Sequence, residues 1–517
     1  MPKQRIRRSP AIVLLTLVFA SGAAADGRQP NGGCDVLKKD DSMRSLLPPC
    51  WYQKAAALKI TTLKKNLRYG HELSTNPNDF SLQIDEIKAQ GFQAIEIFAP
   101  AEGLRAYNGL DTKNFYRIDP ELGTMDDFRL LVRIAHSKGI AAVIFLNVGY
   151  FSVEAPDWLE ACRDKKAGRV TDKVQWFLWS DKPDAPWPPT QDDTYYSQAA
   201  KDREKDYWGW KYSELAGSYF WARWKATAPD RSAIPLPQMN WGAIEWRNEA
   251  ERIVRYWMDT GIDGMLIDAP TCYPYQTWMH NRQHITNVVA SYGNVLIEPE
   301  GGKGTAWITE GGYNAVHDYG LSYVPDTYQS KPPDVITQSV NAGNPRAIEM
   351  NLRAYRDHFA ELGAVLYGKG FSIRTATDPV KRRLQYAVLA GIGDLIVMGK
   401  DQGNPGAEES RIFHMKQMHP ALHSTASRVR LRTDSDEQYY AILKTAQNGS
   451  ERVVAVYNFQ SSPRTVKVDL SGVDTPGLVD LESSEVKKRA ENFTVPMEID
   501  LPAYGYRFFN VLPPADR

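Results

Sequence analysis

Short apolar runs alternate with amphipathic stretches along most of the chain, starting near Trp51. The apolar runs predict strands, and the stretches with helical spacing between them predict helices. The predicted strands are Ala94–Phe98, Ala142–Leu146, Gly264–Ile267, Val295–Ile297 and Leu395–Met398, and the predicted helices are Asp79–Gln90, Met125–Lys138, Glu245–Thr260, Gln276–Tyr292 and Pro379–Ala390. This alternation is typical of a parallel α/β sheet covered by helices. A (β/α)8 TIM barrel is the simplest closed form for about 370 residues. A doubly wound sheet is the alternative, but no GxGxxG motif follows the first strand.

Two segments interrupt this rhythm and divide the chain into domains. Residues 152–238 are rich in Trp, Pro and Asp with weak periodicity, and predict an insertion domain after strand 3. The barrel is then built from residues 51–151 and 239–425. From residue 426 to 517 the pattern changes to short β runs separated by turn residues, which predicts a C-terminal antiparallel β-sandwich domain.

The N-terminus predicts export from the cytoplasm. Basic residues precede a short apolar run, Ala11 to Ala20, and small residues follow it. This is the pattern of a signal peptide, residues 1–25, with cleavage after Ala25 and an N-terminal segment at 26–50. An uncleaved anchor is the alternative, although the apolar run is short for a bilayer. We therefore expect a secreted or periplasmic protein without a membrane contact after cleavage.

The charge balance bears on the class of binding partner, and the cysteines bear on possible disulfides. The 517 residues carry 62 basic and 62 acidic side chains. A neutral balance argues against a nucleic-acid binder, which needs a cationic surface. Four cysteines are present, at positions 34, 50, 162 and 272, and an oxidising compartment permits disulfides. Cys34 and Cys50 are closest in sequence and are the candidate pair, although sequence alone leaves the pairing open.

The sequence predicts neither a cofactor nor a metal site. The cysteines lack CxxC spacing, and His280 and His284 lack the acidic residue of an HExxH motif. The segment from Tyr69 to Asp79 also lacks the spaced acidic residues of a calcium loop.

Two long segments resemble the α-amylase family, glycoside hydrolase family 13, in its oligo-1,6-glucosidase-like branch. They are NWGAIEWRNEAERIVRYWMDTGIDGMLIDAP from Asn240 and YNGLDTKNFYRIDPELGTMDDFRLLVRIAHSKGIAAVIF from Tyr107, and a weaker match is LAGIGDLIVMGKD from Leu389. The resemblance covers most of the chain from Trp51 and implies a retaining mechanism on α-glycosidic bonds. Such a mechanism needs an ionised carboxylate as nucleophile and a protonated carboxyl as acid/base, about 5–5.5 Å apart.

The resemblance assigns these two roles to strand-end carboxyls. Asp268, which follows the apolar strand in GMLIDAP, matches the nucleophile, and its alternative role is capping the next helix. Glu298, in NVLIEPE, matches the general acid, and its apolar surroundings are expected to raise its pKa. Glu300 is the rival acid, but Pro299 is expected to end the strand before it.

Two further carboxylates match the family less strongly. Asp378, in RTATDP, is the candidate for the third catalytic carboxylate, which orients sugar hydroxyls. Because Pro379 follows, Asp378 is equally suited to cap a helix. Asp111, in GLD, matches a substrate-site aspartate, and a simple loop aspartate is the alternative.

The chain departs from the family where the cleaved sugar ring is held. Leu266 stands where the family has the arginine that keeps the nucleophile ionised, and Tyr150 stands in a gap-free alignment where it has a histidine. A buried sugar hydroxyl without its partner costs roughly 1–3 kcal/mol. Either another sugar is bound, with contacts from residues such as Tyr150 and Arg374, or hydrolysis has been lost.

The distribution of aromatic residues is consistent with a site that binds a sugar. Nine of the 14 tryptophans lie between Trp176 and Trp246, in and beside the insertion, where some can line a sugar site and others pack the insertion. Retention of Asp268 and Glu298 also favours an enzyme. The sequence therefore predicts a glycoside hydrolase acting on an oligo- or polysaccharide. An inactive carbohydrate-binding or assembly protein and a transglycosidase or sugar isomerase are the alternatives.

Overall fold

The computed structural model describes residues 46–63, 70–103, 109–120, 123–191, 207–227, 232–302, 304–318, 321, 334–369, 378–488 and 496–513. The predicted signal peptide and Cys34 lie outside these residues. Cys50 is disulfide-bonded, whereas Cys162 and Cys272 are buried cysteines that form no disulfide. Within the described ranges, no helix has the length and apolar character needed to cross a membrane.

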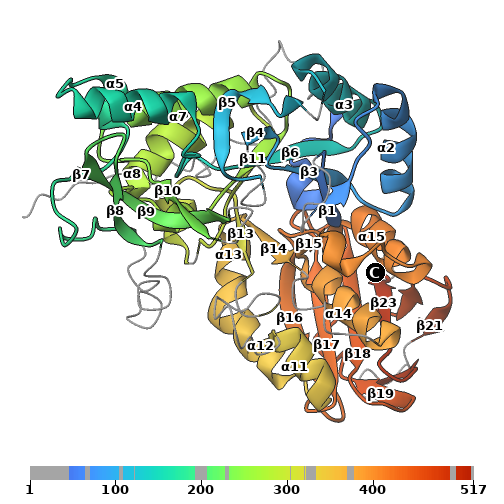
Figure 1. Cartoon of the computed structure of the whole chain (residues 1–517). Coiled ribbons are helices and arrows are strands. Elements are labelled where there is room, and N and C mark those ends of the chain that lie inside the picture. Colours follow the sequence, from blue (N-terminus) through green and yellow to red (C-terminus); the bar gives the residue numbers. More distant parts are fainter. Residues whose placement is uncertain are drawn as a thin grey trace, which may run out of the picture.

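Eight parallel strands form the barrel at the centre of the molecule (Figure 1). In barrel order they are β1 (Ala57–Thr62), β3 (Ala94–Phe98), β6 (Ala141–Leu146), β11 (Gly264–Ile267), β12 (Leu296–Pro299), β13 (Ala315–His317), β14 (Val365–Lys369) and β15 (Leu395–Met398). The register pairs β15 with β1, so the sequence-last strand closes onto the first. The predicted TIM barrel is confirmed, and three predicted strands have the observed bounds.

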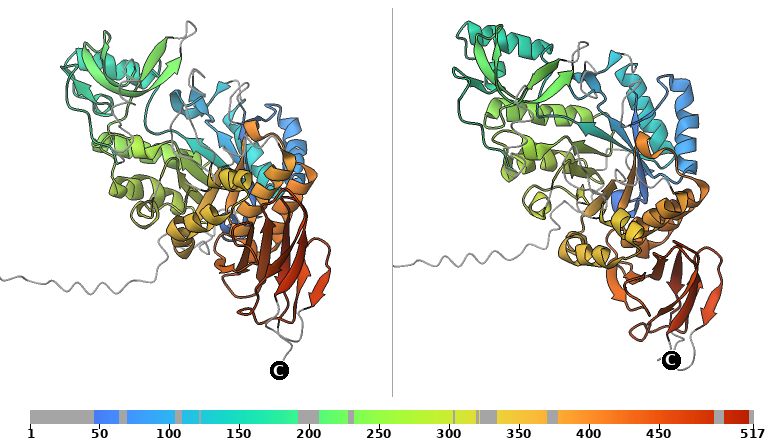
Figure 2. Two further views of the ribbon diagram at one scale, coloured as in Figure 1. Left: turned by 90° about the horizontal axis from the view of Figure 1, so that it is seen from below. Right: turned by 60° about the horizontal axis from the view of Figure 1, so that its bottom comes forward.

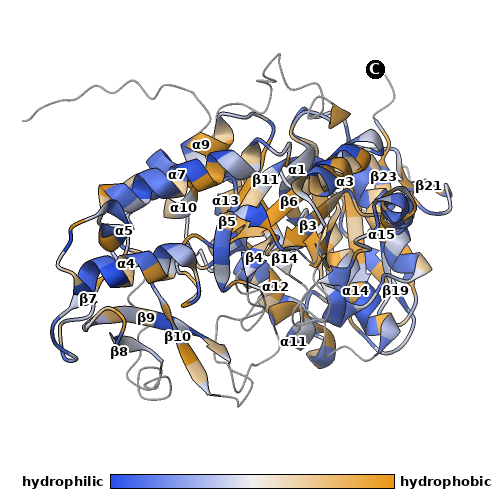
Figure 3. Ribbon diagram, turned by 45° about the horizontal axis from the view of Figure 1, so that its top comes forward, coloured by the Kyte–Doolittle hydropathy of each residue, from blue (hydrophilic) through white to orange (hydrophobic). Residues whose placement is uncertain are grey.

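Helices connect the strands and cover the outside of the barrel. They are α2 (Phe80–Ala89), α3 (Met125–Ser137), α7 (Ile244–Met258), α8 (Trp278–Asn281), α9 (Asn287–Ala290), α10 (Ala306–Thr309), α11 (Val335–Ala342), α12 (Arg346–Asn351), α13 (Asp357–Glu361), α14 (Pro379–Ile392) and α15 (Ala407–Met418). The surface helices turn polar faces outward while the strands are mainly apolar (Figure 3). Helix α3 has a reciprocal cap, since Thr124 accepts from the Asp127 N–H and Asp127 accepts from the Thr124 N–H. The helices therefore cover the barrel strands with their apolar faces and turn their polar faces to solvent.

One asparagine closes the seam between β12 and β13. The Asn314 N–H donates to the Ile297 carbonyl at 3.2 Å, and its Oδ1 accepts from the Ile297 N–H at 2.8 Å. Its Nδ2 also donates to the Val295 carbonyl at 2.7 Å. The side chain thus supplies bonds that a longer strand β13 would otherwise make, next to Glu298.

We expect Asn314→Ala to lower the free energy of unfolding by about 2–4 kcal/mol. The substitution leaves a buried donor and a buried acceptor unpaired, at roughly 1–3 kcal/mol for each. Urea denaturation measures the effect, with the exposed Asn341→Ala as matched control. A loss at Asn314 no larger than the loss at Asn341 would show that the seam does not depend on this side chain.

The insertion forms a small lobe on one side of the barrel (Figure 1). It contains α4 (Pro156–Lys166), α5 (Asp172–Gln175) and an antiparallel sheet of β7 (Trp179–Ser180), β8 (Gly209–Ser213), β9 (Ser218–Thr227) and β10 (Ala233–Pro237). An isolated bridge from Tyr150 to Gln238 attaches the end of the sheet to the loop after β6, and a second bridge joins Phe177 to Met239. The insertion therefore continues directly from a strand end of the barrel. Strands β2 (His71–Glu72), β4 (Ala101–Gly103) and β5 (Thr112–Ile118) lie in the loops after β1 and β3.

The C-terminal strands form a separate β domain at the opposite side from the insertion (Figure 2). A six-stranded antiparallel sheet contains β16 (Ser427–Leu431), β17 (Tyr439–Thr445), β18 (Arg452–Asn458), β23 (Tyr506–Val511), β20 (Gly477–Asp480) and β21 (Val486–Lys488). Strands β19 (Arg464–Val468) and β22 (Met497–Leu501) form a second, two-stranded sheet. Side chains of both sheets share one apolar core, which is the expected β-domain architecture.

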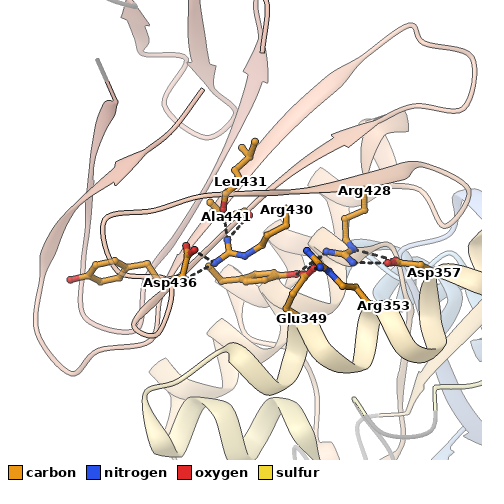
Figure 4. Close-up of polar contacts among 10 residues, drawn as sticks. Glu349, Arg353, Asp357, Arg428, Arg430, Leu431, Asp436 and Ala441 are labelled. Atoms are coloured by element: carbon orange, nitrogen blue, oxygen red, sulfur yellow. Dashed lines mark hydrogen bonds and ion pairs between the residues drawn. The ribbon is translucent and has the colours of Figure 1, made fainter. Parts of the chain in front are cut away.

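Arg428 of β16 joins this domain to the barrel helices. Its guanidinium bonds Asp357 of α13 at 2.6 Å and Glu349 of α12 at 2.6 Å (Figure 4). Tyr440 donates to the same Glu349 carboxylate at 2.7 Å. Only 5% of the Arg428 side chain is exposed, so these bonds are formed largely out of water.

Candidate active site

The two predicted catalytic carboxyls lie at the C-terminal ends of neighbouring barrel strands. Asp268 follows β11, and Glu298 is within β12. The register pairs Leu266 with Glu298, so Asp268 is two residues further along its strand. Because side chains alternate along a strand, Asp268 shares the face of Leu266, which packs in the barrel interior. Both carboxyls are buried, with Asp268 5% and Glu298 0% exposed.

The Asp268 carboxylate has a hydrogen-bonding partner supplied by the loop after β6. Tyr150 Oη donates to Asp268 Oδ2 at 2.7 Å, and the tyrosine is itself buried. Hydrogen bonding to a carboxylate favours its ionised form. Leu266 stands where the resemblance places an arginine, and the Tyr150 hydroxyl is a hydrogen-bond donor to the Asp268 carboxylate.

Backbone geometry constrains the segments on both sides of the Tyr150–Asp268 hydrogen bond. After Asp268 the chain turns through Ala269, whose φ of 36° is strained for a residue with a side chain. The Tyr273 hydroxyl contacts the Asp268 carbonyl and also accepts from the Val148 N–H at 3.4 Å. Any Cβ at Gly149 would lie 2.0 Å from the Tyr273 ring. Glycine is therefore required where this ring packs against the loop that holds Tyr150.

Tyr150→Phe is expected to lower kcat/KM by about tenfold or more, since hydrogen bonds to charged groups contribute roughly 1.5–3 kcal/mol. Loss of the donor disfavours ionised Asp268, so the acidic limb of the pH profile should move to higher pH. Steady-state kinetics across pH measure both effects. Tyr457→Phe, which removes a buried hydroxyl bonded to the Ala387 carbonyl far along the chain, is the control. Identical profiles for the two variants would exclude the proposed contact.

Asp111 is held beside this loop by Asn147. The Asn147 Nδ2 donates to the Leu110 carbonyl and to the Tyr150 carbonyl, both at 2.9 Å. Asp111 is fully buried directly after Leu110. The structure therefore brings the segments of Asp111, Tyr150 and Asp268 together, as the resemblance implied for Asp111 and Asp268.

The sequence analysis missed three polar side chains near Glu298, two of them in the barrel interior and one, Tyr313, in the layer between strands and helices. His317, at the end of β13, contacts the Glu298 carboxyl through Nδ1, and both side chains are almost wholly buried. The Tyr367 hydroxyl of β14 lies near the carboxyls of Glu298 and Glu96, and burial with these neighbouring charges raises its pKa. Tyr313, before β13, likewise has its pKa raised by burial and the nearby Glu298. Both tyrosines therefore stay protonated beside the candidate acid.

The other predicted site residues have different positions. Asp378 is exposed and caps α14, with Oδ1 accepting from the Val380 N–H at 2.8 Å. This is the capping role that the following proline suggested, and the assignment of Asp378 as the third catalytic carboxylate stays a prediction. Glu300 is half-buried beyond the end of β12, and its N–H donates to the Ile267 carbonyl at 2.8 Å. Arg374 lies outside the described residues.

Aromatic and cationic side chains of the insertion reach the barrel mouth. Trp224 of β9 packs against Tyr150, with ring centroids 6.0 Å apart. The buried Arg223 guanidinium lies over Trp224 on one side, at 5.0 Å, and over Trp208 on the other, at 4.9 Å. Most other insertion tryptophans pack against one another, including Trp176 with Trp246 and Trp187 with Trp221. The insertion thus covers the nucleophile side of the site, while many of its tryptophans are structural.

Comparison with known proteins matches two parts of the chain to family models. Residues 81–293 match the model of the alpha amylase catalytic domain, and residues 450–510 match the sucrose hydrolase-like C-terminal domain. An oligo-1,6-glucosidase of Heyndrickxia coagulans is 29% identical over 187 residues, which cover 36% of this chain and 30% of that enzyme. The oligo-1,6-glucosidase IMA5 of Saccharomyces cerevisiae is 24% identical over 296 residues, covering 54% of this chain and 44% of that enzyme. A trehalose synthase of Thermus thermophilus is 26% identical over 162 residues, covering 31% of this chain and 14% of that enzyme.

These matches span less than half the length of each curated relative. Solved structures extend the similarity of fold to almost the whole chain. The α-amylase from H. orenii superposes with a TM-score of 0.65 at 16% identity, covering 89% of this chain and 99% of that one. The barrel, the strand-end carboxyls and the sequence matches lead to one conclusion: the chain is similar to the α-amylase family, glycoside hydrolase family 13, with residues 81–293 matching its catalytic-domain model and oligo-1,6-glucosidases among its relatives.

Proposed function

We propose that this protein is a secreted, retaining glycoside hydrolase that cleaves α-glycosidic bonds of oligo- or polysaccharides. The observation that carries the proposal is the pair of buried carboxyls, Asp268 and Glu298, at the ends of neighbouring strands of a TIM barrel. Active sites of this fold lie at the C-terminal ends of the strands. Secretion is supported by the signal-peptide pattern in residues 1–25.

The two carboxyls are suited to the two steps of a double displacement. In the first step the Asp268 carboxylate attacks the anomeric carbon, while Glu298 gives its proton to the departing glycosidic oxygen. In the second step water attacks the same carbon, Glu298 takes a proton from that water, and Asp268 is released as a carboxylate. Complete burial of Glu298 favours the neutral carboxyl that the first step needs. The Tyr150 hydroxyl favours the ionised Asp268 that the same step needs.

A panel of α- and β-linked oligosaccharides, supplied to the purified mature protein, tests this function. We expect hydrolysis of one or more α-linked sugars, and proton NMR of the first product formed should show the α-anomer. Formation of the β-anomer first would contradict a retaining mechanism. Binding of a sugar without any turnover would favour the inactive carbohydrate-binding alternative.

Transfer to a sugar is the second candidate function, because a trehalose synthase is among the relatives. The covalent intermediate formed on Asp268 is the same, and only the acceptor differs. Product analysis in the presence of added glucose separates the two functions. New disaccharides at the expense of free sugar indicate transfer, whereas unchanged release of free sugar indicates hydrolysis.

A further inference from the structure

The barrel interior gives Glu298 a partner that neither the sequence motifs nor the family comparison assigned. His317 is on the neighbouring strand, β13, and its Nδ1 contacts Glu298 Oε1. The histidine side chain is 2% exposed and the glutamate side chain 0% exposed. Bulk water therefore does not separate the imidazole from the carboxyl.

The seam of the barrel holds this contact in place. Asn314 bonds Ile297, the residue before Glu298, through both its backbone and its side chain. His317 lies three residues after Asn314, at the end of β13. Strands β12 and β13 are thus registered against each other at the position of the acid.

Other titratable groups of the described residues around Glu298 are Tyr313, Tyr367, Glu96 and Asp268. Tyr313 and Tyr367 have pKa values raised by burial and by nearby carboxyls, so they remain neutral. Glu96 of β3 faces Tyr367 across the interior, and Asp268 of β11 is the candidate nucleophile. Unlike these groups, imidazole exchanges a proton in the neutral pH range by its ordinary chemistry.

We propose that His317 is a positioning residue that holds Glu298 and shares one proton with it. This inference rests on the proposed function and deepens it. In the resting enzyme the shared proton moves between imidazole and carboxyl, and the glycosidic oxygen receives it from Glu298 in the first step. The proton that Glu298 takes from water in the second step restores the pair, so the number of protons is conserved over the cycle. Such a pair titrates as a unit rather than as two separate groups.

Two substitutions of His317 distinguish its positioning of Glu298 from its sharing of a proton with Glu298. His317→Asn retains a polar group near the position of Nδ1 but does not titrate, and His317→Leu removes both properties. We expect the alkaline limb of the kcat/KM profile to move to lower pH by about one unit or more in both variants, because the pair then loses its second proton site. His317→Leu should also lower kcat by about 100-fold, and His317→Asn should recover a large part of that loss.

His136 provides a matched control at the other end of the barrel. Its Nε2 lies 2.7 Å from Asp263 Oδ2, and both side chains are fully buried. His136→Gln should lower thermal stability and leave both limbs of the pH profile unmoved. An unmoved alkaline limb in the His317 variants, or an equal shift in His136→Gln, would overturn the proposal.

A second measurement does not depend on turnover. Titration of ¹⁵N-labelled histidines by NMR identifies the His317 signal as the one absent in His317→Asn. In Glu298→Gln that signal should titrate at lower pH than in the wild type, because loss of an anionic neighbour disfavours imidazolium. An unchanged titration would overturn the inference. If the wild type hydrolysed no glycoside, the proposed function would fail, whereas this titration would still decide whether the two groups share a proton.

Discussion

Asp268→Asn is expected to lower kcat by about 10⁴-fold or more, the size of loss found when a residue of a covalent mechanism is removed. The amide keeps the shape of the side chain and its place beside Tyr150 but is a very weak nucleophile. Steady-state kinetics on the best substrate of the wild type measure the effect.

Glu300→Gln is the control for this loss, since Glu300 is a half-buried acid at the same mouth of the barrel. It should retain activity within about tenfold of wild type, because a residue outside the reacting pair contributes binding or orientation alone. A comparable rate in Asp268→Asn and wild type would refute the assignment of the nucleophile. A collapse of activity in Glu300→Gln alone would transfer the acid role from Glu298.

Arg428→Ala is expected to have the largest effect on stability, a loss of about 3–5 kcal/mol in the free energy of unfolding. Removing Arg428 takes away the cation that Asp357 and Glu349 share; Arg353 and Tyr440 still contact Glu349, so the uncompensated charge lies mainly on Asp357. Because the bonds join β16 to α12 and α13, the C-terminal β domain should detach from the barrel before the barrel unfolds. Urea denaturation followed by tryptophan fluorescence and circular dichroism measures the loss and its order.

Arg353→Ala is the matched control, since Arg353 pairs with the same Glu349 but its side chain is 69% exposed (Figure 4). An exposed pair contributes about 0–1 kcal/mol. Equal losses in the two variants would mean that burial of Arg428 does not determine the strength of the joint between the domains.

Local patterns were sufficient to predict three short, mainly apolar strands of the barrel with their observed bounds. Ala94–Phe98, Gly264–Ile267 and Leu395–Met398 are predicted and observed with the same bounds. Strand β1 was missed because Lys59 interrupts its apolar pattern; in the structure this lysine reaches outward to Gln90 and Asn404. Strand β13 has three residues, too few for any periodicity.

Asp268 and Glu298 could be found because each is the acidic residue at the end of an apolar strand. His317 and Glu96 could not be assigned in this way, since their role depends on which strands become neighbours after the barrel closes. A signal was nevertheless present: Glu96 interrupts the apolar run Ile95–Ile97, and a charge inside a buried strand requires a partner. Asp378 was predicted with two roles, and the structure shows one of them, the cap of its own helix, while its catalytic role stays a prediction.

Trapping of the glycosyl-enzyme tests the central claim most directly. A fluorinated glycosyl fluoride of the preferred sugar forms the covalent intermediate readily and releases it slowly, because the ring fluorine destabilises the second transition state. Mass spectrometry of the digested protein should then locate one added sugar on the peptide containing Asp268, and the label should be absent in Asp268→Asn. A label on another residue, or turnover of the natural substrate without any trapped intermediate and with inverted product, would contradict the account.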